Sequence, residues 1–206
     1  MKKVGFIVSI LLISIAMFSF VEGKERKKLE IGEVAPNLAQ SLTDISGDTY
    51  NLRQLNGNKG LLVIFSCNTC PFVIAWEDRY NELFDYCEKN EIGMVLVNSN
   101  EAKREGDDSM AQMKKHAKKN KYKSKYVVDS NSELANAFGA KSTPHVYLFN
   151  NQLNLAYKGA IDDNYKNKEE VTNSYLKEAI KTMAAFDEIK VKETNALGCS
   201  IKRVKI

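Results

Sequence analysis

The order of apolar and polar residues along the chain predicts buried strands that alternate with helices. Residues 61–66 (LLVIFS) and 92–97 (IGMVLV) are continuous apolar runs of strand length, a pattern typical of strands buried on both faces of a sheet. Between them, residues 71–90 carry apolar side chains at helical spacing. Pro71 suits the first turn of this helix, because the N–H that proline lacks would be unpaired there. Further helices are predicted at residues 107–120, 132–138 and 169–186.

The remaining predicted elements are short. Residues 36–50 predict a hairpin with its turn around Gly47, and residues 51–57 predict a single helical turn. Strands are predicted at residues 126–128, 144–150 and 154–157, and the tail 189–206 is polar and strand-like. Buried strands that alternate with helices, followed by an antiparallel pair, indicate an α/β layer sandwich with one mixed sheet.

The first 23 residues are predicted to lie outside this fold. Lys2 and Lys3 precede an apolar run over residues 4–21, and a strongly polar stretch follows it. This order predicts a secretory signal peptide cleaved after Gly23. A run of about 18 residues is also near the lower limit for a membrane-spanning helix, so a retained N-terminal anchor is the alternative.

The domain organisation follows from this boundary. We expect a signal peptide at residues 1–23, a polar linker at 24–32 and one domain at 33–206. The protein is expected to be exported, to the periplasm or another extracytoplasmic compartment, and to contact a membrane only if the first segment is uncleaved.

The composition excludes several protein classes. With 44% hydrophobic residues, 11 Gly and 3 Pro, the chain is neither disordered nor fibrous. Four Cys are too few for a disulfide-dense scaffold, so a hydrophobic core must supply most of the stability. The formal net charge is +4, and seven lysines fall within residues 114–125. We interpret this lysine run as a solvated helix face, and we expect no nucleic-acid partner.

Cys67 and Cys70 form a C-x-x-C motif between a predicted buried strand and a predicted helix. The helix dipole and its free N–H groups stabilise a thiolate, so we predict that the pKa of Cys67 lies below the ordinary value of about 8.5. Cys70, one turn on and predicted to be more buried, is placed to attack a mixed disulfide on Cys67. The pair can then cycle between dithiol and disulfide without a cofactor. A structural disulfide and half of a metal site are the alternatives.

Two segments resemble a known protein family. LLVIFSCNTCPFV resembles the redox-active strand, C-x-x-C and helix of the thioredoxin superfamily, and GAKSTPHVYLFN resembles its strand preceded by a cis-proline. With YKGAIDDN and LGCSIK, residues 33–206 resemble the redoxin branch related to alkyl hydroperoxide reductase and thiol-specific antioxidant proteins. The resemblance implies a thioredoxin-like three-layer sandwich with helices on both faces of a central mixed sheet. It also implies that Cys67 is the nucleophile, that Cys70 is the resolving thiol, and that Thr143 and Pro144 form a cis turn where substrate docks.

Three further residues are candidates for accessory roles. Cys87 continues the apolar face of its helix and is predicted to be a buried, inert thiol. Cys199 is interpreted either as a packed residue of a final strand or as an additional thiol that passes electrons to Cys67 or pairs with Cys87. His145 follows Pro144, and its alternatives are to stabilise the Cys67 thiolate, to bind a soft metal with the two thiols, or to do neither.

These observations predict an exported thiol–disulfide oxidoreductase that acts on protein thiols and disulfides, with an unidentified redox partner and no cofactor or metal. One alternative is a thiol peroxidase of the peroxiredoxin type, but neither Cys67 nor Cys70 lies in a Pro-x-x-x-Thr/Ser-x-x-Cys motif. The other is a copper chaperone with Cys67, Cys70 and His145 as ligands. The Sco-type chaperones share this fold, but three residues separate their cysteines and only two do here.

Overall fold

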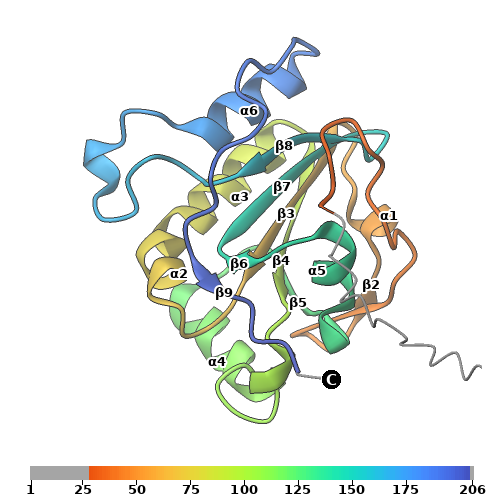
Figure 1. Ribbon diagram of the computed structural model, residues 1–206, viewed down its shortest axis with the longest axis vertical. Helices are drawn as coiled ribbons and strands as arrows, with labels where there is room; N and C mark the ends of the chain where they lie inside the picture. The colour runs from red at the N-terminus through yellow and green to blue at the C-terminus, as the bar shows by residue number, and fades with distance from the viewer. Residues whose placement is uncertain (1–27, 205–206) are drawn as a thin grey trace, which may run out of the picture.

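The computed structural model describes residues 28–204 (Figure 1). Its strands are β1 (Leu42–Asp44), β2 (Thr49–Tyr50), β3 (Gly60–Ser66), β4 (Ile92–Asn98), β5 (Lys125–Val128), β6 (Ser142–Thr143), β7 (His145–Asn150), β8 (Leu155–Gly159) and β9 (Cys199–Ser200). Its α-helices are α1 (Leu52–Leu55), α2 (Pro71–Trp76), α3 (Tyr80–Lys89), α4 (Met110–Asn120), α5 (Glu133–Phe138) and α6 (Tyr175–Ala184).

Seven of the strands form one mixed sheet, in the order β2-β1-β5-β4-β3-β7-β8. The central strand β3 runs parallel to β4, from Gly60 opposite Ile92 to Ser66 opposite Asn98, and antiparallel to β7. All of its residues are buried, as the apolar run predicts. β6 and β9 form a separate two-stranded sheet, and this short sheet lies beside the candidate site.

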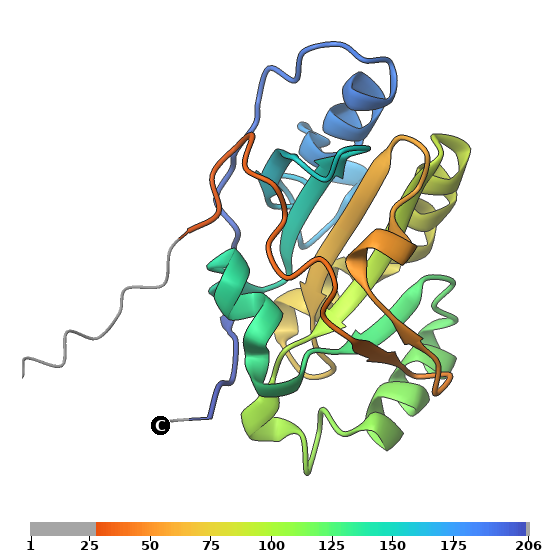
Figure 2. The same cartoon turned by 90° about the vertical axis from the view of Figure 1, so that its right-hand side faces the viewer.

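Helices cover both faces of the large sheet, so the predicted three-layer α/β sandwich is confirmed (Figure 2). Apolar side chains of α2, α3, α4 and α6 pack on one face, against strand residues that include Leu62, Ile64 and Leu96. α1 and α5 pack on the other face, against residues that include Val63 and Phe65. Successive strand residues point to opposite faces, which is why neighbours in β3 enter different cores.

Two predicted helices are shorter or less regular than the sequence pattern suggests. The helix at 71–90 consists of α2 and α3 joined by a turn of 3₁₀-helix, η1 (Glu77–Arg79). The helix predicted at 169–186 begins only at Tyr175. The carboxylate of Asp163 accepts the backbone N–H groups of Thr172 and Asn173, at 3.0 and 2.9 Å, which holds these residues outside the helix.

The described part of the predicted linker packs against the domain, which corrects that boundary. Leu29 is buried, and its N–H donates to the carbonyl of Phe138 at 3.2 Å. The buried ammonium of Lys158 donates to the carbonyl of Leu29 at 2.7 Å. Residues 28–32 therefore belong to the domain. The signal peptide predicted at residues 1–23 lies outside the described residues.

Candidate redox site

The two cysteines of the C-x-x-C motif lie where the central strand ends and α2 begins. Cys67 directly follows β3, and Pro71 is the first residue of α2. Cys70 is therefore the N-cap residue of this helix, with extended backbone dihedrals of φ −70° and ψ 123°. The position at the helix terminus that the motif predicts for Cys67 therefore belongs to Cys70.

Buried polar side chains hold the loop between the cysteines. The backbone N–H of Asn68 donates to Asp108 Oδ1 at 2.9 Å, and its side-chain amide donates to the carbonyl of Asp107 at 2.7 Å. The hydroxyl of Tyr126 donates to Asn68 Oδ1 at 3.0 Å, and Asn98 Nδ2 donates to Asp108 Oδ1 at 2.7 Å. Asp108 was not predicted from the sequence, because no local motif links it to the cysteines. These hydrogen bonds fix the loop and thus the two sulfur atoms.

The predicted turn lies against both sulfur atoms. The Thr143–Pro144 peptide bond is cis, as the family resemblance implied. Cys67 Sγ lies 3.3 Å from Thr143 Oγ1. When protonated, Cys70 Sγ donates to the carbonyl oxygen of Thr143 at 3.1 Å. Tertiary structure therefore brings Thr143 into contact with both thiols.

The pKa values of the two thiols are coupled and shift in opposite directions. The S–H of Cys67 hydrogen-bonds to Cys70 and lowers the pKa of Cys70 to about 4, with a further contribution from the Cys199 thiol. The same hydrogen bond, together with burial, raises the pKa of Cys67 far above its ordinary value. Cys67 is 2% exposed and Cys70 is 4% exposed, so Cys70 is not the more buried residue. Cys70 Sγ nevertheless lies 3.1 Å from a carbonyl oxygen, which accepts only from a protonated thiol, whereas the Thr143 hydroxyl can donate to an ionised Cys67. The two thiols are therefore a coupled pair that shares one proton.

The C-terminal strand β9 lies beside the same turn, as Figure 1 shows for β6 and β9. In this antiparallel pair Cys199 is opposite Thr143, and Ser200 is opposite Ser142. Cys199 also packs against the cluster formed by Cys67, Cys70 and Val73. The backbone edge at Thr143, predicted to dock an extended substrate segment, is therefore occupied by the protein's own C-terminal segment.

Two other predicted candidates are Cys87 and His145. Cys87 is fully buried as predicted, and burial raises its pKa to about 12. The ring of His145 lies 4.6 Å from that of Tyr147. Burial, and to a lesser extent the positive charge of Lys158, lowers the pKa of His145 to about 4. Within residues 28–204, no three His, Cys, Asp or Glu side chains are grouped to hold a metal ion. The copper-ligand set hypothesised with His145 is thus not assembled.

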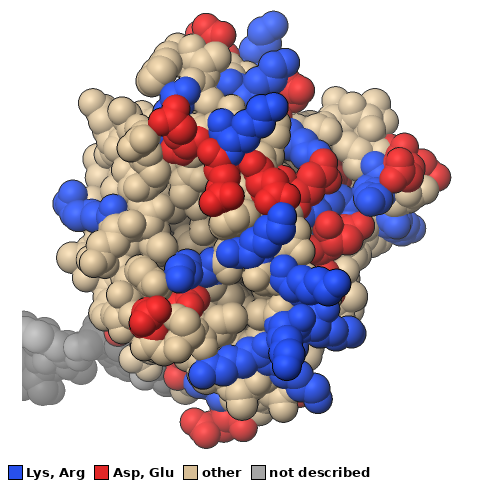
Figure 3. All heavy atoms as spheres, turned by 180° about the vertical axis from the view of Figure 1, so that it is seen from behind, with Lys and Arg blue, Asp and Glu red and all other residues tan. Residues whose placement is uncertain are grey.

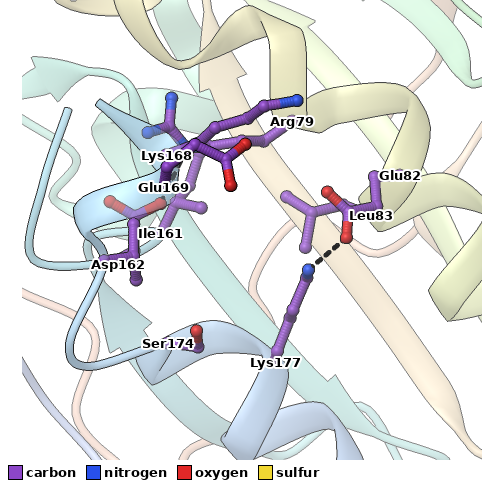
Figure 4. Close-up of a pocket in the computed structure, with 10 residues that line it drawn as sticks. Arg79, Glu82, Leu83, Ile161, Asp162, Lys168, Glu169, Ser174 and Lys177 are labelled. Atoms are coloured by element: carbon purple, nitrogen blue, oxygen red, sulfur yellow. Dashed lines mark hydrogen bonds and ion pairs between the residues drawn. The ribbon is translucent and has the colours of Figure 1, made fainter. Parts of the chain in front are cut away.

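Two other surface features carry many charges. A pocket of about 290 Å³ lies between η1, α3, the segment after β8 and the start of α6, and four of its charged groups form two ion pairs (Figure 4). Arg79 Nε lies 2.9 Å from Asp162 Oδ2, and Lys177 pairs with Glu82. Lysines gather over α4 and the following loop (Figure 3). On α4 these side chains are exposed, in keeping with a solvated helix face.

The chain is similar to several known proteins. The AhpC/TSA family matches residues 31–158, more than half of the chain. An uncharacterized conserved protein from Geobacillus kaustophilus is 30% identical, with a TM-score of 0.78 over 84% of this chain and 92% of that one. A hypothetical protein from Sinorhizobium meliloti 1021 is 25% identical, with a TM-score of 0.78 over 86% and 97%. A thioredoxin-like protein solved in its oxidized form is 20% identical, with a TM-score of 0.58 over 79% and 100%.

No curated protein matches this sequence. The family match covers the C-x-x-C motif and the cis turn, and the solved structures extend the likeness to most of the chain. The protein therefore has a thioredoxin-like α/β fold and belongs to the AhpC/TSA family.

Proposed function

We propose that this protein is a thiol–disulfide oxidoreductase whose Cys67 and Cys70 alternate between a dithiol and a disulfide, with protein thiols and disulfides as substrates. Membership of the AhpC/TSA family supports redox chemistry on thiols. The observation that carries the proposal is the pair of thiols between β3 and α2, whose two sulfur atoms both lie against Thr143 of the cis turn. A thiolate held beside a second thiol is the arrangement that disulfide exchange requires.

The reaction proceeds in two exchanges. The Cys70 thiolate attacks one sulfur of a substrate disulfide, a mixed disulfide forms, and the other substrate sulfur leaves as a thiolate. Cys67 then loses its proton and attacks Cys70 Sγ, which forms the Cys67–Cys70 bond and releases the second substrate thiolate. The enzyme dithiol loses two electrons and the substrate disulfide gains them; the reverse sequence oxidises a substrate dithiol. This order reverses the roles that the family resemblance implied for the two cysteines.

The test measures stoichiometric exchange with the full-length protein. Reduced protein, freed of reductant, is mixed separately with oxidised glutathione and with a carrier protein that bears one exposed disulfide, and new disulfides are mapped by peptide mass spectrometry. We expect a Cys67–Cys70 disulfide in the wild type and no exchange in Cys70→Ser. Cys87→Ser is the matched control, because it removes a thiol that lies elsewhere in the core. A wild-type protein that leaves both disulfide substrates unreduced would refute the proposal.

A second candidate function is a thiol peroxidase, which family membership favours. The Cys70 thiolate would attack a peroxide oxygen, release water or an alcohol and become a sulfenic acid. Cys67 would then condense with it, releasing water and forming the same disulfide. Oxidation of the reduced protein by hydrogen peroxide, compared with its oxidation by an equal concentration of oxidised glutathione, separates the two functions. Faster oxidation by peroxide identifies a peroxidase.

We also propose that the protein is exported, which rests on the charged and apolar order of residues 1–23. Outside the cytosol a disulfide formed in the active site can persist. Among the described residues, no helix has the length and apolar character needed to cross a membrane. Cell fractionation, with mass spectrometry of the N-terminus, tests export: a mature chain that begins at Lys24 supports it, and an intact chain in the cytosol contradicts it.

A further inference from the structure

Cys70 has contacts with two other thiols. Cys67 lies in the same packed cluster as Cys70, and Cys199 packs against that cluster; interaction with either thiol lowers the pKa of Cys70. The three cysteines, with Val73, form one packed cluster. Cys67 and Cys199 both touch Cys70, so a disulfide on Cys70 has two possible partners within reach.

The three thiols differ in their access to solvent. Cys67 and Cys70 are 2% and 4% exposed, whereas Cys199 is only partly buried. β9 occupies the edge of the Thr143 turn where an extended substrate would pair, so a bulky protein substrate reaches Cys70 directly only when β9 moves away from this turn. Among these three sulfurs, Cys199 is therefore the one that a protein partner can approach.

The position of Cys199 is fixed by the anchored segments around it. Before it, the N–H of Thr194 donates to the carbonyl of Lys158 at 3.0 Å. After it, the N–H of Ile201 donates to the carbonyl of Lys141 at 3.0 Å. Because the chain is held on both sides, Cys199 stays beside Cys70 without closing a covalent bond.

We propose that Cys199 is a third redox thiol, which attacks Cys70 in the Cys67–Cys70 disulfide and so carries the disulfide to the protein surface. The inference rests on the proposed function. In this step the Cys199–Cys70 bond forms and the Cys67–Cys70 bond breaks, and Cys67 leaves with the electron pair. Cys67 takes up the proton that Cys199 gives up, so no external oxidant or reductant is needed. A partner thiol then attacks the exposed sulfur of Cys199 and releases Cys70 as the thiolate.

Disulfide mapping tests this connection directly. Full-length Cys67→Ser is reduced, freed of reductant and oxidised with oxidised glutathione, and its disulfide-linked peptides are identified by mass spectrometry. We expect an intramolecular Cys70–Cys199 disulfide. The double variant Cys67→Ser/Cys199→Ser should instead keep glutathione on Cys70. Glutathione retained on Cys70 of the single variant, with Cys199 still free to react with iodoacetamide, would overturn the proposal.

Exchange kinetics separate the failure of this inference from the failure of the proposed function. Cys199→Ser should slow exchange with a protein disulfide by at least about tenfold, while the Cys67–Cys70 disulfide still forms with the small disulfide oxidised glutathione. Ser200→Ala, which changes the exposed neighbour of Cys199, is the matched control and should keep the wild-type rate. If the wild type and Cys199→Ser reduce the protein disulfide equally fast, the third thiol is refuted and the oxidoreductase stands. If the wild type exchanges with neither substrate, the oxidoreductase itself fails.

Discussion

Gly198 controls how closely the C-terminal segment approaches the candidate site. A Cβ atom at this position would lie 2.2 Å from the carbonyl oxygen of Thr143 and 2.7 Å from its carbonyl carbon, both backbone atoms. Ordinary van der Waals contact begins at 3.4 Å, so Gly198→Ala forces β9 away from the Thr143 turn. We predict that this single methyl group exposes the thiols that β9 now covers.

The size of the effect follows from the overlap. Inserting a methyl group into a closely packed contact costs about 1–3 kcal/mol. The opened state of the C-terminal segment does not contain this overlap and so is not penalised. Since each ~1.4 kcal/mol changes an equilibrium tenfold, the population of the opened state should rise about 5- to 150-fold. The rest of the domain keeps its core, because neither of the two large clusters includes Gly198.

Alkylation kinetics measure this opening. Reduced full-length protein is treated with iodoacetamide, and the labelling rate of each cysteine is followed by peptide mass spectrometry. Cys70 should be labelled about 5 to 150 times faster in Gly198→Ala than in the wild type. Gly106→Ala is the control, because its added Cβ would meet nothing nearer than Lys103 O at 3.8 Å. Slow labelling of the buried Cys87 reports that the fold is intact. Unchanged labelling of Cys70 in a folded Gly198→Ala variant would refute the steric argument.

Three further predictions concern the thiol pair and its support. Cys70→Ser should abolish disulfide exchange. Cys67→Ser should keep part of it, because Cys199 can still resolve a mixed disulfide on Cys70. Stopped-flow thiol titration of both variants measures the exchange that remains. The pH dependence of alkylation tests the lowered pKa of Cys70. A thiol with a pKa of about 4 is already ionised between about pH 6 and 8, whereas a free thiol with a pKa of about 8.5 is not. The alkylation rate of Cys70, divided by that of a free thiol at the same pH, should therefore fall steadily over this range, and a constant ratio would contradict the lowered pKa. Asp162→Ala removes the 2.9 Å partner of Arg79 Nε and the acceptor of Trp76 Nε1, while Arg79 keeps its ion pair with Asp78. Urea unfolding should therefore show a loss of about 1–3 kcal/mol. An unchanged free energy of unfolding would show that water replaces the carboxylate.

The sequence by itself determined the central strands and the position of the redox motif. Residues 61–66 and 92–97 are apolar at every position or nearly so, which is typical of short strands buried on both faces, and they lie in β3 and β4. The C-x-x-C motif follows the first of these runs directly. Its place at the end of β3 was therefore predictable from local pattern alone.

The protonation of the two cysteines depended on the tertiary structure. The start of α2 at Pro71 makes Cys70 the N-cap residue, and the spacing of apolar side chains does not fix a helix start to within one turn. The pKa values of Cys67 and Cys70 are set largely by the interaction between these two thiols, and that of Cys70 also by Cys199. Local sequence contains no information about this third contact.

The tertiary structure alone decided what fills the edge of the Thr143 turn. β9 contains only Cys199 and Ser200, too short for any periodicity to reveal its partner. The pairing depends on hydrogen bonds that hold the C-terminal segment at Lys158 and Lys141, and on the missing side chain of Gly198. These contacts join residues far apart in the sequence, and they exist only after the sheet has formed. The sequence therefore predicted a pair of redox thiols, and the folded chain showed a cluster of three.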